Sequence, residues 1–400
     1  MPSGKELREG FTVSIREVPF TSILSSIVDN RGRTAPTAES GIPLIATNCI
    51  KDDRLYPVQE KVRYVSQETY DTWFRAHPRS GDIVFVCKGS PGRVALVPEP
   101  VSFAIAQDMV AVRADPAKVY PRYLLAVLRS PEVRQRIDGM HVGTMIPHFK
   151  KGDFKNLDIP LIDDDAQRFV GDWYFELSEK IESNYRLIEL IPQLIHANVQ
   201  KQLGQGKSIV PIASLARFVN GGAFTKGASG SGRMVLRIAE LNSGIGPSTV
   251  YNDIEVPDDK TARAGDILMS WSGSLGVYRW YRDEAIVNQH IFKVIPDGLP
   301  AWIVFDRLQE VMSTFQGIAK DKATTMGHIQ RGHLESTLVE VPLKEGVELL
   351  EPSMGSLWAR LLQLERENLQ LASLRDTLLP SFISDSIRVT DASSLVGVLA

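Results

Sequence analysis

The feature that most constrains this sequence is a long internal repeat. The segment GDIVFVCKGSPGRV from Gly81 matches GDILMSWSGSLGVY from Gly265, which is a shift of about 184 residues. Further blocks follow in the same order: GTMIPHFKKGDF from Gly143 partly matches TTMGHIQRGHL from Thr324, and LDIPL matches VEVPL. This shift is far longer than the repeat of a solenoid, so it indicates a duplicated domain.

Each copy of the repeat has the pattern of a mixed α/β domain. The GDI block predicts a strand, a Gly/Ser turn and a second strand, because β-branched and apolar residues flank the turn. Helical stretches are fewer, and the main ones are expected over 121–137 and, in the second copy, over 302–315. We therefore expect an α+β fold with two similar mixed α/β domains.

A different pattern follows each copy of the repeat. Apolar residues recur at alternating spacings of four and three, which is typical of a coiled-coil seam, and a seam Asn often fixes the register of the pairing. The predicted helix-pairing residues are Leu177, Ile181, Asn184, Ile188 and Ile191 in the first helix and Leu357, Leu361, Leu364, Asn368 and Leu371 in the second. The other interpretation is two surface helices, each packed on its own domain, with the Asn side chains facing water.

These patterns predict the order of the segments. Antiparallel pairing of the two helices is expected because the second domain connects their ends, and Pro192 is expected to kink or break the first helix. The predicted segments are a first domain over 1–163, a central helix over 164–205, a second domain over 206–344, a C-terminal helix over 345–385 and a tail over 386–400.

Composition and charge exclude several classes of protein. With 43% hydrophobic and 23% charged residues, the chain is globular rather than disordered or collagen-like. Its two cysteines are too few for a disulfide framework, so a reducing cytoplasm is expected. No apolar run approaches the ~18 residues needed to cross a bilayer, and no membrane partner is expected. The net charge of -3 hides a sum of +4 over 1–160 and of zero over 206–343, which permits nucleic-acid binding.

Enzymatic motifs are incomplete or missing in the sequence. Gly206, Lys207 and Ser208 resemble the end of a P-loop, but Lys201 stands where the loop requires glycine. HExxH, EF-hand and GxSxG motifs do not occur. The matched histidines of the two copies have no neighbouring nucleophile, and a loop histidine that donates one hydrogen bond is the simpler interpretation. We expect no catalytic residue and no metal site in this chain.

The repeat does place small hydrogen-bond donors at equivalent positions of both copies. Exposed N–H groups and hydroxyls in such turns suit phosphate oxygens and base edges. The candidate DNA-binding residues are Lys88, Ser90, Arg93, Thr144, His148, Lys150 and Lys151 in the first copy and Ser270, Ser272, Ser274, Thr324, Thr325, His328 and Arg331 in the second. The alternative is that the glycines only form tight hairpins and the charged side chains are solvated.

The ordered set of blocks resembles the DNA specificity (S) subunit of type I restriction-modification systems. The resemblance covers nearly the whole chain and rests on GDIVFVCKGSPGRV, AQDMV, GTMIPHF, LDIPL and a helix that contains KIESN around Asn184. The second copy is more diverged, since Ser272 takes the position of Lys88 and Val277 that of Arg93.

This resemblance implies two target recognition domains, each reading one half of a split DNA target, with paired helices that set the spacer. It implies double-stranded DNA, two methylation (M) subunits and restriction (R) subunits as partners. The exposed sides of 166–203 and 354–379 would dock the methylation subunits. S-adenosylmethionine, ATP and Mg would be bound by those partners and none by this chain. An alternative from another class is a non-catalytic tandem interaction scaffold that has lost, or never had, DNA binding.

Overall fold

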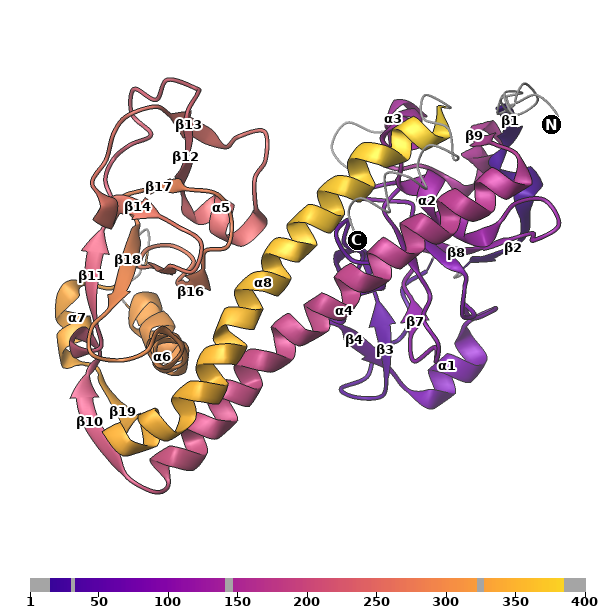
Figure 1. The fold of residues 1–400 in the computed structure, drawn as a ribbon. Coiled ribbons are helices and arrows are strands. Elements are labelled where there is room, and N and C mark those ends of the chain that lie inside the picture. Colours follow the sequence, from indigo (N-terminus) through magenta and orange to yellow (C-terminus); the bar gives the residue numbers. More distant parts are fainter. Residues whose placement is uncertain (1–14, 30–32, 141–146, 322–326, 385–400) are drawn as a thin grey trace, which may run out of the picture. The chain divides into compact units, whose positions relative to one another are not determined.

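The computed structural model describes residues 15–29, 33–140, 147–321 and 327–384. Two compact units make up the chain, one of Met1–Ser183 with Asn368–Ala400 (unit 1) and one of Asn184–Glu367 (unit 2). Each unit contains one copy of the repeat and a part of each long helix, α4 (Asp164–Leu203) and α8 (Lys344–Ile383) (Figure 1). The boundaries of the units differ from those of the predicted segments, because each long helix is divided between the two units. Each part of a helix packs into the core of the domain in its own unit.

The domain of unit 1 is built on two main sheets. One is antiparallel with the strand order β2-β8-β5-β6, the other has the order β4-β3-β7, and β1 pairs with β9. The strands are β1 (Arg16–Pro19), β2 (Leu24–Asp29), β3 (Ile42–Ile45), β4 (Arg63–Val65), β5 (Ile83–Val86), β6 (Val94–Leu96), β7 (Ala104–Ile105), β8 (Met109–Ala114) and β9 (Asp158–Leu161). The helices are α1 (Gln67–Trp73), α2 (Pro121–Arg129) and α3 (Pro131–Met140), with short 3₁₀ turns η1 (Phe20–Ile23), η2 (Thr47–Cys49) and η3 (Lys151–Asn156).

The prediction of one helix over 121–137 is wrong, because α2 ends before Pro131 and α3 begins there. Proline has no N–H and disfavours helical backbone at the residue before it. That residue, Ser130, has φ -64° and ψ 145°, outside the helical region. Its hydroxyl accepts a hydrogen bond from the Val133 N–H at 3.3 Å, so Ser130 caps α3.

The domain of unit 2 repeats this plan. Its main sheets have the orders β11-β18-β15-β16 and β13-β12-β17-β14, and β10 pairs with β19. The strands are β10 (Lys207–Pro211), β11 (Ala216–Asn220), β12 (Arg233–Leu236), β13 (Val250–Asn252), β14 (Thr261–Ala262), β15 (Ile267–Ser270), β16 (Gly276–Arg279), β17 (Ala285–Val287), β18 (Ile291–Pro296) and β19 (Leu338–Pro342). The helices are α5 (Ile238–Ser243), α6 (Ala301–Asp321) and α7 (Arg331–Ser336), with 3₁₀ turns η4 (Ile212–Ser214) and η5 (Asp258–Lys260).

The recurring Gly-Asp pair has a structural role in both domains. Gly81 and Gly265 have φ values of 83° and 100°, a region that favours glycine. The Asp82 carboxylate accepts a hydrogen bond from the Arg79 N–H at 2.8 Å and closes the turn before β5. Asp266 accepts from the Arg263 N–H at 2.7 Å in the same way before β15. The most recognisable motif of the repeat therefore shapes a turn.

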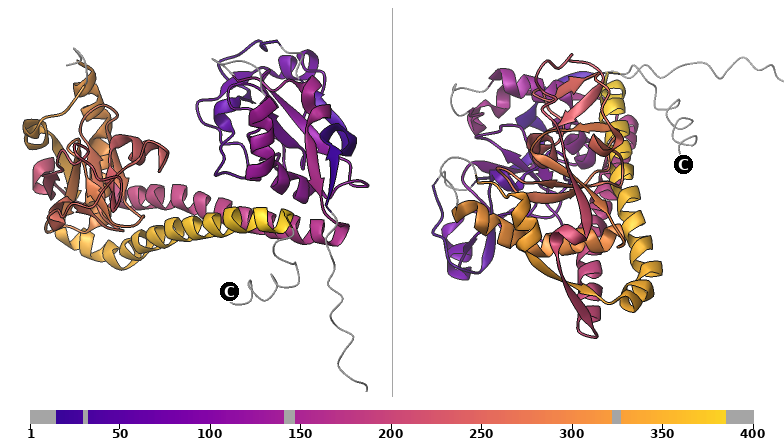
Figure 2. Two further views of the ribbon diagram at one scale, coloured as in Figure 1. Left: turned by 90° about the horizontal axis from the view of Figure 1, so that it is seen from above. Right: turned by 90° about the vertical axis from the view of Figure 1, so that its left-hand side faces the viewer.

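Within each unit, parts of α4 and α8 lie side by side and run antiparallel (Figure 2). In unit 1, Arg375 Nη1 donates to Ser178 Oγ at 3.2 Å, and Asn368 Nδ2 donates to the Ile181 carbonyl at 3.4 Å. In unit 2, Asn184 Nδ2 donates to Glu367 Oε2 at 3.1 Å. Asn184 is 0% exposed and Asn368 6% exposed, so the interpretation with both Asn side chains facing water is wrong.

The predicted helix-pairing residues differ in their burial. The buried ones are Ile181, Asn184, Ile191, Leu361, Leu364 and Asn368, and the half-buried ones are Leu177, Ile188, Leu357 and Leu371. Arg375, expected to interrupt the seam, is buried, and its guanidinium lies 5.1 Å from the centre of the Tyr174 ring. Pro192 lies inside α4, and the helix continues past it to Leu203, so it does not break there.

Candidate nucleic-acid interface

The Gly/Ser turn of unit 1 is joined to a segment much later in the chain. Lys88 and His148 form an antiparallel β-bridge. The Gly89 N–H donates to the Pro147 carbonyl at 3.0 Å, and the Phe149 N–H donates to the Cys87 carbonyl at 2.9 Å. We call this surface, residues 87–93 with 147–151, turn site 1. It brings together two groups of candidate residues that the sequence left apart.

Unit 2 contains the same arrangement. Ser272 and His328 form the equivalent bridge, and the Gly273 N–H donates to the Gly327 carbonyl at 3.1 Å. The Ile329 N–H donates to the Trp271 carbonyl at 3.0 Å. We call residues 270–276 with 327–331 turn site 2. The three backbone contacts match those of turn site 1, so the duplication preserves the geometry of the site.

Two of the candidate cations of turn site 1, Arg93 and Lys151, already have acidic neighbours. Lys150 and Lys151 are exposed, whereas Lys88, Ser90, Arg93 and His148 are half-buried. Arg93 Nε lies 3.1 Å from Asp52 Oδ2, and Lys151 Nζ lies 2.5 Å from Asp29 Oδ2. Phosphate would compete with these carboxylates for the two cations. Thr144 lies outside the described residues.

Turn site 2 presents fewer of its candidates at the surface. Ser274, His328 and Arg331 are exposed. Ser272 is 7% exposed and Ser270 is 0% exposed. The Ser270 hydroxyl donates to the Ser274 carbonyl at 2.6 Å and accepts from the Gly276 N–H at 2.9 Å, so it holds the turn and has no surface for a ligand. Thr324 and Thr325 lie outside the described residues.

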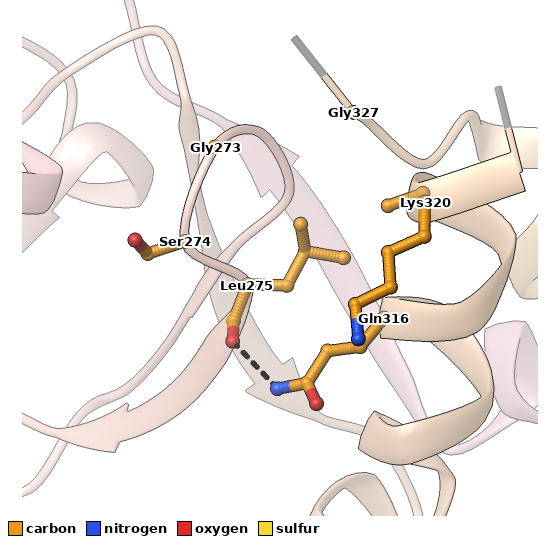
Figure 3. Close-up of a pocket in the computed structure, with 7 residues that line it drawn as sticks. Gly273, Ser274, Leu275, Gln316, Lys320 and Gly327 are labelled. Carbon is orange, nitrogen blue, oxygen red and sulfur yellow. Dashed lines mark hydrogen bonds between the residues drawn. The ribbon is translucent and has the colours of Figure 1, made fainter. Parts of the chain in front are cut away.

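A pocket of about 360 Å³ opens beside turn site 2 (Figure 3). Its lining residues are Gly273, Ser274, Leu275, Gln316, Ala319, Lys320 and Gly327. Gln316 Nε2 on α6 donates to the Leu275 carbonyl at 3.2 Å, which ties the turn to the helix (Figure 3). Arg134 on α3 makes a similar bond to the Gly92 carbonyl at 2.7 Å in unit 1. A helix side chain therefore supports the turn in each unit.

The strand register identifies further positions around the turn sites that the sequence analysis missed. The Cys87 N–H donates to the Asp108 carbonyl at 2.9 Å, and the Trp271 N–H donates to the His290 carbonyl at 3.2 Å, so these two pairs are equivalent. The sequences agree with this register, since AQDMV and NQHIF align Asp108 with His290. Residue types at these positions differ completely between the units, whereas the backbone contacts are the same.

The Cys87 thiol is buried and unreactive in this setting. Burial, followed by the negative charges of Asp29 and Asp108, raises the pKa of the Cys87 thiol to about 12. The thiolate is the reactive form of cysteine, so Cys87 is not a nucleophile near neutral pH.

Within residues 15–29, 33–140, 147–321 and 327–384, no group of three or more His, Cys, Asp or Glu side chains is arranged to hold a metal ion.

Hydropathy gives one further finding about the long helices. Among the helices that the structure describes, none combines the length and the apolar character of a membrane-spanning segment.

The comparisons with known proteins identify the fold. No protein-family model matches the chain, and the search of curated proteins gives no match. Among solved structures, the S subunit of a type I restriction-modification system from M. genitalium aligns over 94% of this chain and 98% of its own, with 16% identity and a TM-score of 0.57. The HsdS subunit from Thermoanaerobacter tengcongensis aligns over 92% and 96% of the two chains, with 16% identity and a TM-score of 0.37. The chain therefore has the fold of a type I restriction-modification S subunit.

Proposed function

We propose that this chain is the DNA specificity subunit of a type I restriction-modification complex. Unit 1 and unit 2 each bind one half of a bipartite DNA target through their turn sites. The observation that carries the proposal is the duplicated turn site: the backbone contacts are the same, while the side chains around them differ. One scaffold with two sets of side chains suits the recognition of two different sequences, because base edges are distinguished by their donors and acceptors.

The proposal gives the two long helices the role of setting the spacer. Each of α4 and α8 has 40 residues, which corresponds to about 60 Å at 1.5 Å per residue. Inserting equal numbers of helical residues into both helices is expected to lengthen the spacer between the half-sites. An unchanged spacer in a folded variant would contradict this role.

The same helices are our proposed docking surface for two methylation subunits. Leu187, Leu190 and Leu194 recur on one side of α4 and are 41%, 56% and 49% exposed. Residues three and four apart share a face of a helix, so the three side chains form one apolar stripe. A stripe of this kind suits burial against a protein partner.

We propose that the chain itself catalyses nothing. Methyl transfer would use S-adenosylmethionine on the methylation subunits, and cleavage would use ATP and Mg on restriction subunits. The buried, protonated Cys87 thiol at turn site 1 supports a role in recognition rather than chemistry. Methylation of DNA by the purified chain alone would contradict this assignment.

A random duplex pool tests the proposal. The chain is co-expressed with a methylation subunit, the complex is incubated with the pool, and the bound DNA is sequenced. Two short, unlike half-sites at one fixed spacing are expected. A folded complex that retains DNA without sequence selection would contradict the specificity function.

A tandem interaction scaffold is the second candidate, because Arg93 and Lys151 are already paired with carboxylates. Salt distinguishes the two functions: binding through phosphate contacts weakens steeply as salt rises, whereas apolar protein binding does not. A steep salt dependence of duplex binding supports the specificity subunit.

A further inference from the structure

We propose that Asn220 reads a hydrogen-bond acceptor on a base edge in the half-site bound by unit 2. This inference rests on the proposed function and names a specificity-determining residue that the sequence analysis did not find. Asn220 is exposed and is the last residue of β11. It lies beside turn site 2, because it bonds to Trp271, the residue before Ser272.

The contact with Trp271 fixes the orientation of the Asn220 amide. Trp271 Nε1 lies 2.9 Å from Asn220 Oδ1. An indole N–H can only donate, so the amide oxygen must face it. The opposite atom of the amide, Nδ2, carries two hydrogens and can only donate. A free Asn side chain offers both a donor and an acceptor, whereas this one presents a donor to any further ligand.

The Trp271 ring is itself held in place. Its centre lies 5.3 Å from that of His290 and 5.9 Å from that of Phe292, and its main chain bonds to both neighbouring segments. These ring contacts favour the orientation in which Trp271 Nε1 faces Asn220. The donor that orients Asn220 is therefore in place in the structure without a ligand.

The backbone on the other side of Asn220 is equally constrained. The Gly221 N–H donates to the Ile291 carbonyl at 3.0 Å. A Cβ atom at Gly221 would lie 2.2 Å from the Asn288 carbonyl oxygen, so only glycine permits this approach. Side chains that read bases need such preorganisation, because a loosely held group loses discrimination.

Unit 1 carries the opposite chemistry at the equivalent position. Asp29 pairs with Val110 across the sheet, as Asn220 pairs with Phe292, and the strand register makes these pairs equivalent. The Asp29 carboxylate can only accept, and Lys151 lies 2.5 Å from it. At this equivalent position, Asn220 thus presents a donor in unit 2 and Asp29 presents an acceptor in unit 1.

A donor at this place selects among bases. In the major groove the acceptors are N7 and O6 of guanine, N7 of adenine and O4 of thymine, whereas the exocyclic amines of cytosine and adenine are donors. Asn220 is therefore expected to favour an acceptor and to disfavour the cytosine amine.

The test uses the complex of the full chain with a methylation subunit and the random duplex pool. Asn220→Asp keeps the size of the side chain and one oxygen for Trp271, but replaces the donor by an acceptor. At one position of one half-site, the preference for cytosine, whose amine donates, is expected to rise about tenfold over the base that the wild type selects. Trp271→Phe removes the indole donor, and the preference at that same position is expected to relax.

Asn242→Asp is the matched control. Asn242 is also an exposed amide of unit 2 whose Oδ1 accepts from an aromatic donor, the Tyr278 hydroxyl, at 2.6 Å. The control is expected to leave both half-sites unchanged. A wild-type half-site in the folded Asn220→Asp complex would overturn the inference, as would the same shift in the Asn242→Asp complex. If the wild-type complex selects no sequence at all, the proposed function fails instead.

Discussion

Lys88 and His148 form an antiparallel β-bridge between the Gly/Ser turn of unit 1 and a segment that follows its helices. Ser272 and His328 form the same bridge in unit 2. Backbone contacts thus assemble both turn sites, and they do not depend on the residue types at Lys88 and Ser272. The surrounding side chains are free to differ, as the proposed recognition of two different half-sites requires.

The seam Asn of unit 1 makes the pairing of the helices sensitive to charge. Asn368 is 6% exposed and donates to the Ile181 carbonyl, so Asn368→Asp places a buried negative charge against a carbonyl oxygen. A loss of roughly 3 kcal/mol in the free energy of unfolding is expected, because it is costly to bury a negative charge beside a carbonyl oxygen. Asn368→Leu, which buries no charge, is the control and is expected to lose less. Urea denaturation followed by circular dichroism measures both, and equal losses would contradict the argument.

An ion pair between the buried Glu182 and the half-buried Arg54 anchors the domain of unit 1 to α4. Glu182 is 4% exposed and accepts from Arg54 Nε at 3.1 Å, from Arg54 Nη2 at 2.6 Å and from the Leu55 N–H at 3.3 Å. Glu182→Ala is expected to cost about 2 kcal/mol, since it removes the carboxylate from the half-buried Arg54 guanidinium and from the Leu55 N–H. The exposed Glu176 on the same helix is the control, and Glu176→Ala is expected to stay within about 0.5 kcal/mol. Similar thermal midpoints for the two variants would rule this anchor out.

Gly221 provides a test of the backbone beside Asn220. A Cβ atom there meets the Asn288 carbonyl oxygen at 2.2 Å, whereas a Cβ atom at Gly246 meets nothing within 4 Å. Gly221→Ala is expected to destabilise the protein by roughly 1–3 kcal/mol, and Gly246→Ala to change little. Denaturant midpoints provide the comparison. A Gly221→Ala protein as stable as wild type would mean that this close approach is not required.

The two thiols predict a simple labelling result. Cys49 and Cys87 are both buried and free, so the native protein is expected to react with a thiol reagent far more slowly than the denatured protein, which exposes two thiols. Burial raises the pKa of the Cys87 thiol in the folded protein to about 12, above its ordinary value of 9.0. The protonated thiol therefore stabilises the fold fully below pH 9, and this stabilisation is lost as the pH rises towards 12. Rapid labelling of the native protein at pH 8 would contradict this burial.

The duplicated domains and their turns were predictable because glycine and aspartate at a tight turn leave a strong local pattern. The break between α2 and α3 at Ser130 could also have been predicted from Pro131, since proline disfavours helical backbone at the residue before it. Both signals are local, so a single stretch of sequence contains them.

The side chains around the turn sites were less predictable. Asn220 and Asp29 become equivalent only through the register of β11 with β18 and of β2 with β8, because the sequences of β2 and β11 share only the valine before each of them. Ser270 looked like a surface donor, but its hydroxyl is used inside the turn. Such roles depend on contacts between distant segments, which a local pattern does not contain.

Duplication of one domain tests the central claim most directly. β1 with β9 and β10 with β19 are the equivalent joints, and the pair Arg16–Leu161 corresponds to Ser208–Val341, so residues 208–341 can be replaced by a second copy of residues 16–161. The variant with two copies of the first domain is co-expressed with a methylation subunit, and the folded complex is used to select DNA from the random duplex pool. The account predicts a target with two copies of the half-site that unit 1 reads. Retention of the original two unlike half-sites would contradict it.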